Sequence, residues 1–174
     1  MIVYRVIEDV YSYDKNGTSR NEFQDYQKGI ISYPRDSYND GLNTHNYKHD
    51  TDYLHFFHFY EGALEYVSGI PSMGWDDRCF IALYNIPENL LDQYRGFGLY
   101  PESRHPNIPV LEYAIPFSEL EDGFIKGEVI PYSYGNKYSE AYKKYMEGDY
   151  SSYLKDMDEL DQQFVKSYVN ANQK

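Results

Sequence analysis

The sequence predicts an α+β fold, with a small mixed or antiparallel β core, helices inserted between the strands and a C-terminal helical pair. Short segments rich in β-branched and aromatic residues predict the strands, and segments of helical period bounded by Gly or Pro predict the helices. A length of 174 residues suits one domain. We expect the α+β core over residues 1–132 and the C-terminal helices over 133–174.

The strands are expected in five places. They are Ile2–Glu8, Tyr53–Phe59, Cys79–Ile86, Val110–Pro116 and Phe124–Tyr132. The segment YLHFFHF, residues 53–59, is apolar almost throughout, which is typical of a strand in the centre of a sheet.

The helices lie between and after these strands. We expect a short helix closed by Gly29, one from Glu61 to Gly69, and one that begins at Pro87 and stops at Gly96. The GFG segment at 96–98 is interpreted as this helix stop and a turn, followed by a loop. Residues 9–20 are polar with a turn at 16–17, and residues 32–52 form a long polar loop.

Two helices are expected at the C-terminal end. The first is capped by Ser139 and closed by Gly148, and a longer one spans about 150–171. The longer helix has an apolar stripe, which suits core packing or a face for a partner.

The chain is acidic, with a net charge of −12 and a pI of about 4.7. This charge disfavours direct binding to nucleic-acid phosphates or to an anionic membrane. It is compatible with a basic protein partner, with mimicry of nucleic acid, or simply with solubility. Cys79 is the single cysteine, so no intramolecular disulfide is possible. Without a signal-peptide pattern or a long apolar run, we expect a cytoplasmic protein.

Motifs for phosphate loops, dinucleotide binding and nucleophile elbows are absent from the sequence. His45 and His49 lie four residues apart near Asp50, which would suit a metal if the segment were helical. The surrounding Asn, Thr and Gly argue against a helix, so no metal is expected. By strand alternation His55 shares a face with Phe57, whereas His58 faces the other side. His55 is either a hydrogen-bonded structural residue or a group that stacks on a flat ligand.

Two charged residues lie inside short apolar strands: Arg5 in VYRV and Glu112 in VLEYAIP. A buried Arg stays charged and needs an anion. Either Arg5 forms a structural ion pair with an acidic neighbour, or it holds a phosphate or carboxylate of a ligand. Glu112 is expected either to pair with Arg5 or to face the same nucleotide.

In its order of motifs, the chain resembles the ADP-ribosyltransferases over residues 1–130. Members of that family carry Arg or His on the first strand, a strand that lines the nicotinamide pocket, and Glu on a later strand. The resemblance implies that NAD is a substrate, that Glu112 stabilises the ribosyl cation, and that Arg5 binds the diphosphate. It also implies that His55 positions the ribose or nicotinamide, with Tyr4 and Phe57 as aromatic walls.

The chain departs from the family pattern at two places. The second strand has His55 and Phe57 where the family has Ser-Thr-Ser, and Val110 stands two residues before Glu112 where an acidic or amide residue would activate an arginine acceptor. The resemblance therefore implies an acceptor other than arginine on a macromolecular target, in a toxin or phage setting. The alternatives are lost catalysis, or an acidic inhibitor that contacts a basic protein through the segment 149–163.

Overall fold

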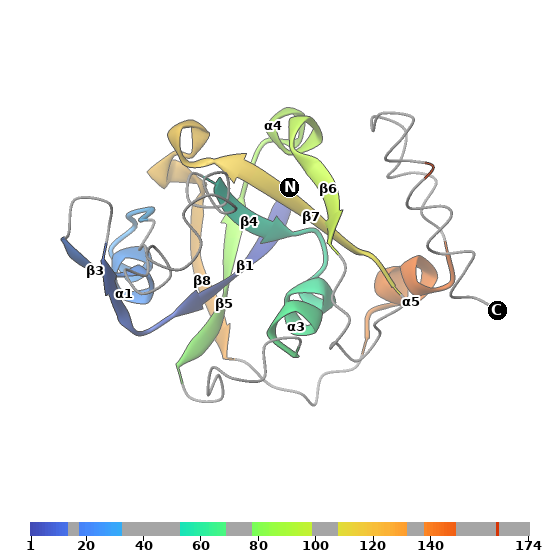
Figure 1. The fold of residues 1–174 in the computed structure, drawn as a ribbon, viewed down its shortest axis with the longest axis horizontal. Coiled ribbons are helices and arrows are strands. Elements are labelled where there is room, and N and C mark those ends of the chain that lie inside the picture. The colour runs from blue at the N-terminus through green and yellow to red at the C-terminus, as the bar shows by residue number, and fades with distance from the viewer. Residues whose placement is uncertain are drawn as a thin grey trace.

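The computed structural model describes residues 1–13, 18–32, 53–68, 78–98, 108–131, 138–148 and residue 163. Its main feature is a six-stranded sheet in the order β6-β7-β4-β1-β5-β8, in which all neighbouring strands are antiparallel (Figure 1). Helices lie between these strands along the chain and follow the last of them, so the α+β prediction is confirmed.

The strands of this sheet agree closely with the sequence prediction, apart from β6. Their bounds are β1 Ile2–Glu8, β4 Tyr53–Phe57, β5 Cys79–Asn85, β6 Arg95–Gly98, β7 Val110–Pro116 and β8 Ile125–Pro131. The segment 53–57 lies in the interior of the sheet, as its apolar character indicates. Residues 33–52 of the expected loop 32–52 lie outside the described residues, and so does the expected long helix over about 150–171 apart from residue 163.

Strand β6 corrects the interpretation of residues 96–98 as a helix stop and turn. Helix α4, Glu88–Gln93, ends before Gly96, and residues 95–98 then pair with β7. A four-residue, Gly-rich segment has little strand propensity of its own, so the ladder with β7 decides its conformation. A separate hairpin, β2 Tyr11–Tyr13 with β3 Ser19–Asn21, also has no counterpart among the expected strands.

The remaining helices are short and have clear ends. Helix α1, Glu22–Gln27, is capped by the Asn21 side chain, and Gly29 follows it with a φ of +76°. Helix α3 spans Tyr60–Ser68, and α5 spans Glu140–Met146 with Ser139 accepting a hydrogen bond from the Tyr142 N–H. The 3₁₀ turns η2, Phe117–Glu119, and η3, Asp122–Phe124, lie between β7 and β8.

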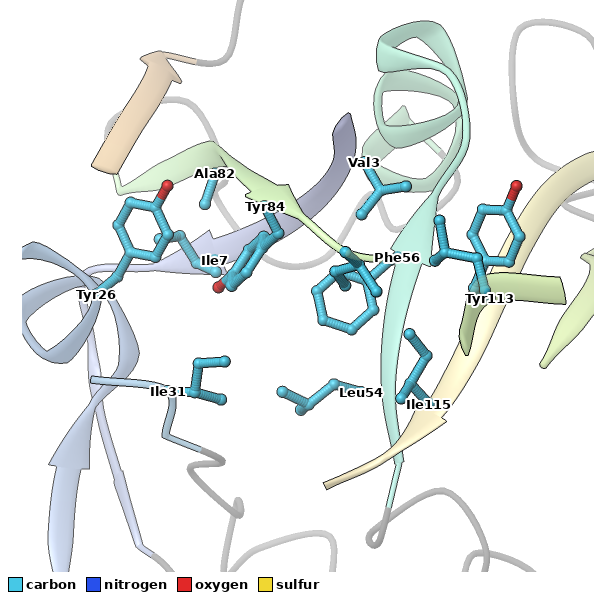
Figure 2. Close-up of a cluster of buried hydrophobic side chains, with 12 residues drawn as sticks. Val3, Ile7, Tyr26, Ile31, Leu54, Phe56, Ala82, Tyr84, Tyr113 and Ile115 are labelled. Carbon is cyan, nitrogen blue, oxygen red and sulfur yellow. The ribbon is translucent and has the colours of Figure 1, made fainter. Parts of the chain in front are cut away.

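The sheet has two covered faces, and strand register fixes which residues share each of them. Tyr4 is opposite Phe57, which is opposite Glu112, so these three side chains lie on one face. The other face carries the larger core, where side chains of α1, β1, β4, β5 and β7 converge (Figure 2). Its labelled members include Val3, Ile7, Tyr26, Leu54, Phe56, Tyr84 and Tyr113.

Helix α3 covers part of the face that carries Tyr4, Phe57 and Glu112. Ala63 and Leu64 pack there against Phe57, Ile81 and Val110. The helix approaches the sheet closely at Gly62, where an added Cβ would lie 3.1 Å from a methyl carbon of Val110. A third cluster joins α5 to the end of the sheet through Tyr142 and Tyr145, which pack on Phe59 and Leu111.

The Tyr26 hydroxyl connects α1 to an irregularity between β5 and β8. The register of these strands shifts between Ala82 and Tyr84. There the hydroxyl lies 2.6 Å from the carbonyl oxygen of Leu83 and 2.9 Å from that of Glu128, and it accepts a hydrogen bond from the Gly127 N–H. The phenol thus satisfies backbone groups that the regular ladder would otherwise pair.

We expect Tyr26→Phe to lower the free energy of unfolding by about 1–3 kcal/mol, because buried backbone groups lose their partner. Urea denaturation followed by circular dichroism measures this change. Tyr11→Phe is the matched control, since Tyr11 is 69% exposed and should change stability by less than about 0.5 kcal/mol. An equal effect of the two substitutions would contradict the role given to Tyr26.

Candidate functional site

Four of the five residues expected at a site lie on one face of the sheet. Tyr4 is on β1, His55 and Phe57 are on β4, and Glu112 is on β7. These strands are neighbours in the order β7-β4-β1, although residues 57 and 112 are far apart in the sequence. We call the side of the sheet formed by β1, β4 and β7, together with helix α3, the His–Glu face.

The imidazole and the carboxylate are adjacent on this face. His55 Nδ1 lies 3.9 Å from Glu112 Oε1, and the two side chains are 40% and 15% exposed. Glu112 is therefore largely shielded from water while His55 remains accessible. A partly buried carboxylate beside an imidazole can stabilise a developing positive charge, and the imidazole can donate a hydrogen bond to a ligand.

Aromatic side chains lie on the same face as this pair. Tyr66 of α3 packs on Phe57 with ring centroids 5.4 Å apart, and Tyr4 meets Tyr60 edge to face at 5.9 Å. Burial raises the pKa of the Tyr4 phenol, and the charge of Glu61 raises it further. Burial is also the main cause of a raised pKa at Tyr66. Both phenols therefore keep their protons at neutral pH and remain hydrogen-bond donors.

The sequence interpretation did not single out Tyr66. The available signal was the helical period of EGALEYVSG, in which residue 66 falls three positions after Ala63. The charges of Arg5, Glu8 and Glu112 all influence the pKa of Tyr66, which places its phenol among the charged groups around β1 and β7. Tyr66 therefore belongs to the His–Glu face.

Arg5 lies on the opposite face from Glu112. Because Tyr4 shares a face with Phe57 and Glu112, the next residue of β1 points to the other side. There Arg5 Nε donates to Glu22 Oε1 at 2.6 Å, and Arg5 Nη1 donates to the backbone carbonyl of His55 at 3.2 Å. Burial opposes its charge, but the neighbouring Glu22 carboxylate outweighs this and raises the pKa of Arg5.

The expectation that Arg5 pairs with Glu112 is thus wrong, and its guanidinium is not presented to a ligand on the His–Glu face. Arg5 instead has the structural ion pair that was the other interpretation, with Glu22 of α1 as its acidic neighbour. The side chain of Arg5 is 14% exposed and that of Glu22 12%.

His58 has a structural environment distinct from that of His55. It follows the last residue of β4, and its backbone N–H donates to the Leu111 carbonyl. Its Nδ1 lies 2.6 Å from the Tyr113 hydroxyl, and its ring packs edge to face on Phe59. Burial, assisted by the positive charge of Arg95, lowers the pKa of His58 to about 4. The ring is therefore uncharged at neutral pH.

The described residues do not favour a cysteine nucleophile or a metal site. Burial is the main cause that raises the pKa of the Cys79 thiol to about 12, so the thiolate nucleophile is scarcely populated. Within the ranges described, no three His, Cys, Asp or Glu side chains gather as a metal site would require. His45 and His49 lie outside these ranges.

In the part of the chain that the structure describes, none of the helices has the length and apolar character needed to span a bilayer.

Comparison with known proteins adds no assignment. No family model matches the chain, and no curated protein or solved structure gives a significant match. What bears on function is therefore the geometry of the His–Glu face and the distribution of charge around it.

We expect Arg5→Met to lower the free energy of unfolding by about 3–5 kcal/mol, because it leaves the carboxylate of Glu22 largely buried without its cation. Chemical denaturation measures the loss. Adding Glu22→Leu should recover a large part of it, since the double variant removes both charges. A double variant less stable than Arg5→Met alone would contradict a structural ion pair.

Proposed function

We propose that this protein is an ADP-ribosyltransferase-like enzyme that breaks the N-glycosidic bond between nicotinamide and ribose. The observation that carries the proposal is the adjacency of His55 and Glu112 on the neighbouring strands β4 and β7, with Phe57 and Tyr4 of β1 on the same face. NAD is the substrate that the resemblance to ADP-ribosyltransferases implies.

Each residue type suits one part of this reaction. When nicotinamide leaves, positive charge develops on the ribose ring, and the Glu112 carboxylate stabilises it. The shielding of Glu112 from water strengthens that interaction, because fewer water dipoles compete with it. The accessible ring of His55 donates a hydrogen bond to a ribose hydroxyl or to the nicotinamide amide. The partly exposed rings of Tyr4 and Tyr66 provide aromatic surface for the flat nicotinamide ring. Phe57, expected as an aromatic wall, is 1% exposed beneath α3, so it supports Tyr66 and does not contact a ligand.

Arg5 acts in this proposal as a positioning residue. Its hydrogen bond to the His55 carbonyl holds β4 against β1, and its ion pair with Glu22 fixes the guanidinium on the side of the sheet where α1 lies. The diphosphate role implied by the resemblance would require this side chain on the other face. Arg5 thus acts on the site through the backbone of His55.

The acceptor is proposed to be a group other than arginine on a macromolecular target, or water. Val110 occupies the position two before Glu112 and is buried in the cluster beneath α3. The acidic or amide side chain that would activate an arginine acceptor is therefore missing at this position, where a buried valine stands instead. A cytoplasmic location, where NAD is available, and a toxin or phage setting form part of this proposal.

We expect Glu112→Gln to lower the rate of nicotinamide release by about 100- to 1,000-fold, because the neutral amide stabilises the ribosyl cation poorly. Release is measured by chromatography with NAD and, separately, with nicotinamide riboside. The control is Glu140→Gln on the exposed side of α5, which should leave the rate unchanged. If Glu112→Gln and the unaltered protein release nicotinamide equally from both substrates, Glu112 has no such role.

A second candidate function is binding to a basic protein partner without catalysis. Exposed carboxylates gather on α4 and on the two 3₁₀ turns, which Figure 1 shows at the same end of the sheet. Glu119 raises the pKa of Tyr94, the residue that follows α4, chiefly through a side-chain hydrogen bond, so the two segments lie close together. The exposed members are Glu88, Asp92, Glu119, Glu121 and Asp122. Such a surface suits a partner that normally binds nucleic acid, and its binding would weaken as salt rises.

Under this second function, the double change Glu119→Gln and Glu121→Gln should weaken binding to poly-lysine by about tenfold at low salt. The control changes Glu140 and Glu147 of the α5 region to Gln, which removes the same charge from another surface. Fluorescence anisotropy measures both affinities over a salt series. Equal losses for the two variants would show that net charge alone determines the binding.

A further inference from the structure

The neighbours of Glu112 in the sheet decide from which side a ligand can approach its carboxylate. On its own strand, the residues that share its face are Val110 and Ala114. Across the sheet, Phe57 of β4 is opposite Glu112 on one side, and Gly96 of β6 is opposite it on the other. Residues directly opposite each other in paired strands point to the same side of the sheet, so Gly96 extends the His–Glu face by one strand.

Helix α3 closes the β4 side of Glu112. Phe57 is 1% exposed and Val110 is 3% exposed, and both belong to the cluster beneath this helix. The helix backbone lies so close at Gly62 that an added Cβ would be 3.1 Å from Val110. Close packing of this kind leaves no room for a ligand to approach Glu112 beneath α3.

The β6 side is open. A Cβ added to Gly96 would meet no atom within 4 Å, apart from the glycine itself and its two chain neighbours. Gly96 also does not have the positive φ found at Gly29 and Gly127, so its backbone would accept an L-residue. Glycine within a strand lowers strand stability, and it often marks a place that a ligand approaches closely. The missing side chain at position 96 therefore leaves space beside Glu112.

We propose that Gly96 is a specificity-determining residue, and that the nicotinamide–ribose end of NAD reaches Glu112 across β6 through the space that a side chain at position 96 would fill. The inference rests on the proposed cleavage of the N-glycosidic bond and specifies how the substrate enters. Because β6 is the outermost strand of the described sheet, the diphosphate and adenosine lie beyond its edge, away from the carboxylate. This placement does not require Arg5, which is paired with Glu22 on the other face.

The first experiment introduces Gly96→Cys and measures how fast a small maleimide modifies the new thiol. Background labelling is low, because Cys79 is the single cysteine of the chain, is 2% exposed and has a thiol whose pKa burial raises to about 12. We expect rapid labelling of Gly96→Cys, slowed about tenfold or more by saturating NAD. The matched control is Gly123→Cys in η3, where an added Cβ also meets nothing within 4 Å. Its labelling should not depend on NAD.

The second experiment fills the space with Gly96→Val. We expect kcat/KM for nicotinamide release from NAD to fall about tenfold or more, mainly through a higher KM, because the added methyl groups occupy the route of the substrate. The midpoint of thermal unfolding should stay the same or rise, since Val suits a strand better than Gly. Gly96→Ala should have a smaller effect on kcat/KM. Gly123→Val adds the same volume in η3 and should leave kcat/KM unchanged.

The outcomes distinguish this inference from the proposed function. If NAD is cleaved in a Glu112-dependent manner but does not slow the labelling of Gly96→Cys, the route across β6 is wrong and the enzymatic function stands. Resistance of Gly96→Cys to labelling, with Gly123→Cys reactive, would show that the space is closed and would also overturn the inference. Equal losses of kcat/KM in Gly96→Val and Gly123→Val would contradict a specific role for position 96. If the unaltered protein neither binds nor cleaves NAD, both proposals fail.

Discussion

The rest of the structure depends on the Arg5 guanidinium, a permanent charge placed under the middle of an apolar sheet. Such a charge is tolerated because Glu22 pairs with it and because the backbone carbonyl of His55 accepts a hydrogen bond from the guanidinium. These contacts connect α1, β1 and β4. One ion pair therefore fixes the helix that contributes to the main core, and it also fixes the backbone from which the His55 side chain projects to the other face.

The site follows from the alternation of side chains along three strands in register. Because Tyr4, Phe57 and Glu112 are opposite one another, they form a row across β1, β4 and β7, and His55 lies beside this row. Helix α3 completes the face with Tyr66 and two buried carboxylates, and its close approach depends on Gly62. The same alternation separates the row from Arg5, so the two charged strand residues that stand out in the sequence serve different surfaces.

Local signals in the sequence were sufficient for most elements. The range Ile2–Glu8, the glycine that closes α1 and the cap at Ser139 are all as predicted, because each depends on neighbours along the chain. The partner of Arg5 could not be predicted in this way. Alternation assigns residues to faces within one strand, but only the register between strands shows that Arg5 and Glu112 lie on opposite faces. Strand β6 was missed for a related reason, since its pairing with β7 and not its composition makes it a strand.

The position of Arg5 also limits what the His–Glu face can bind. A carboxylate that stabilises a ribosyl cation repels phosphate as well, so a diphosphate held beside that carboxylate needs a cation there too. Arg5, the one Lys or Arg of these three strands, is instead paired with Glu22 on the far side of the sheet. If it were turned to the His–Glu face, Glu22 would remain buried without its partner, and the core would lose the contact that holds α1. A stable core needs the Arg5 guanidinium beside Glu22, whereas a diphosphate site would need it on the His–Glu face. The side chain cannot do both, and in the structure it pairs with Glu22.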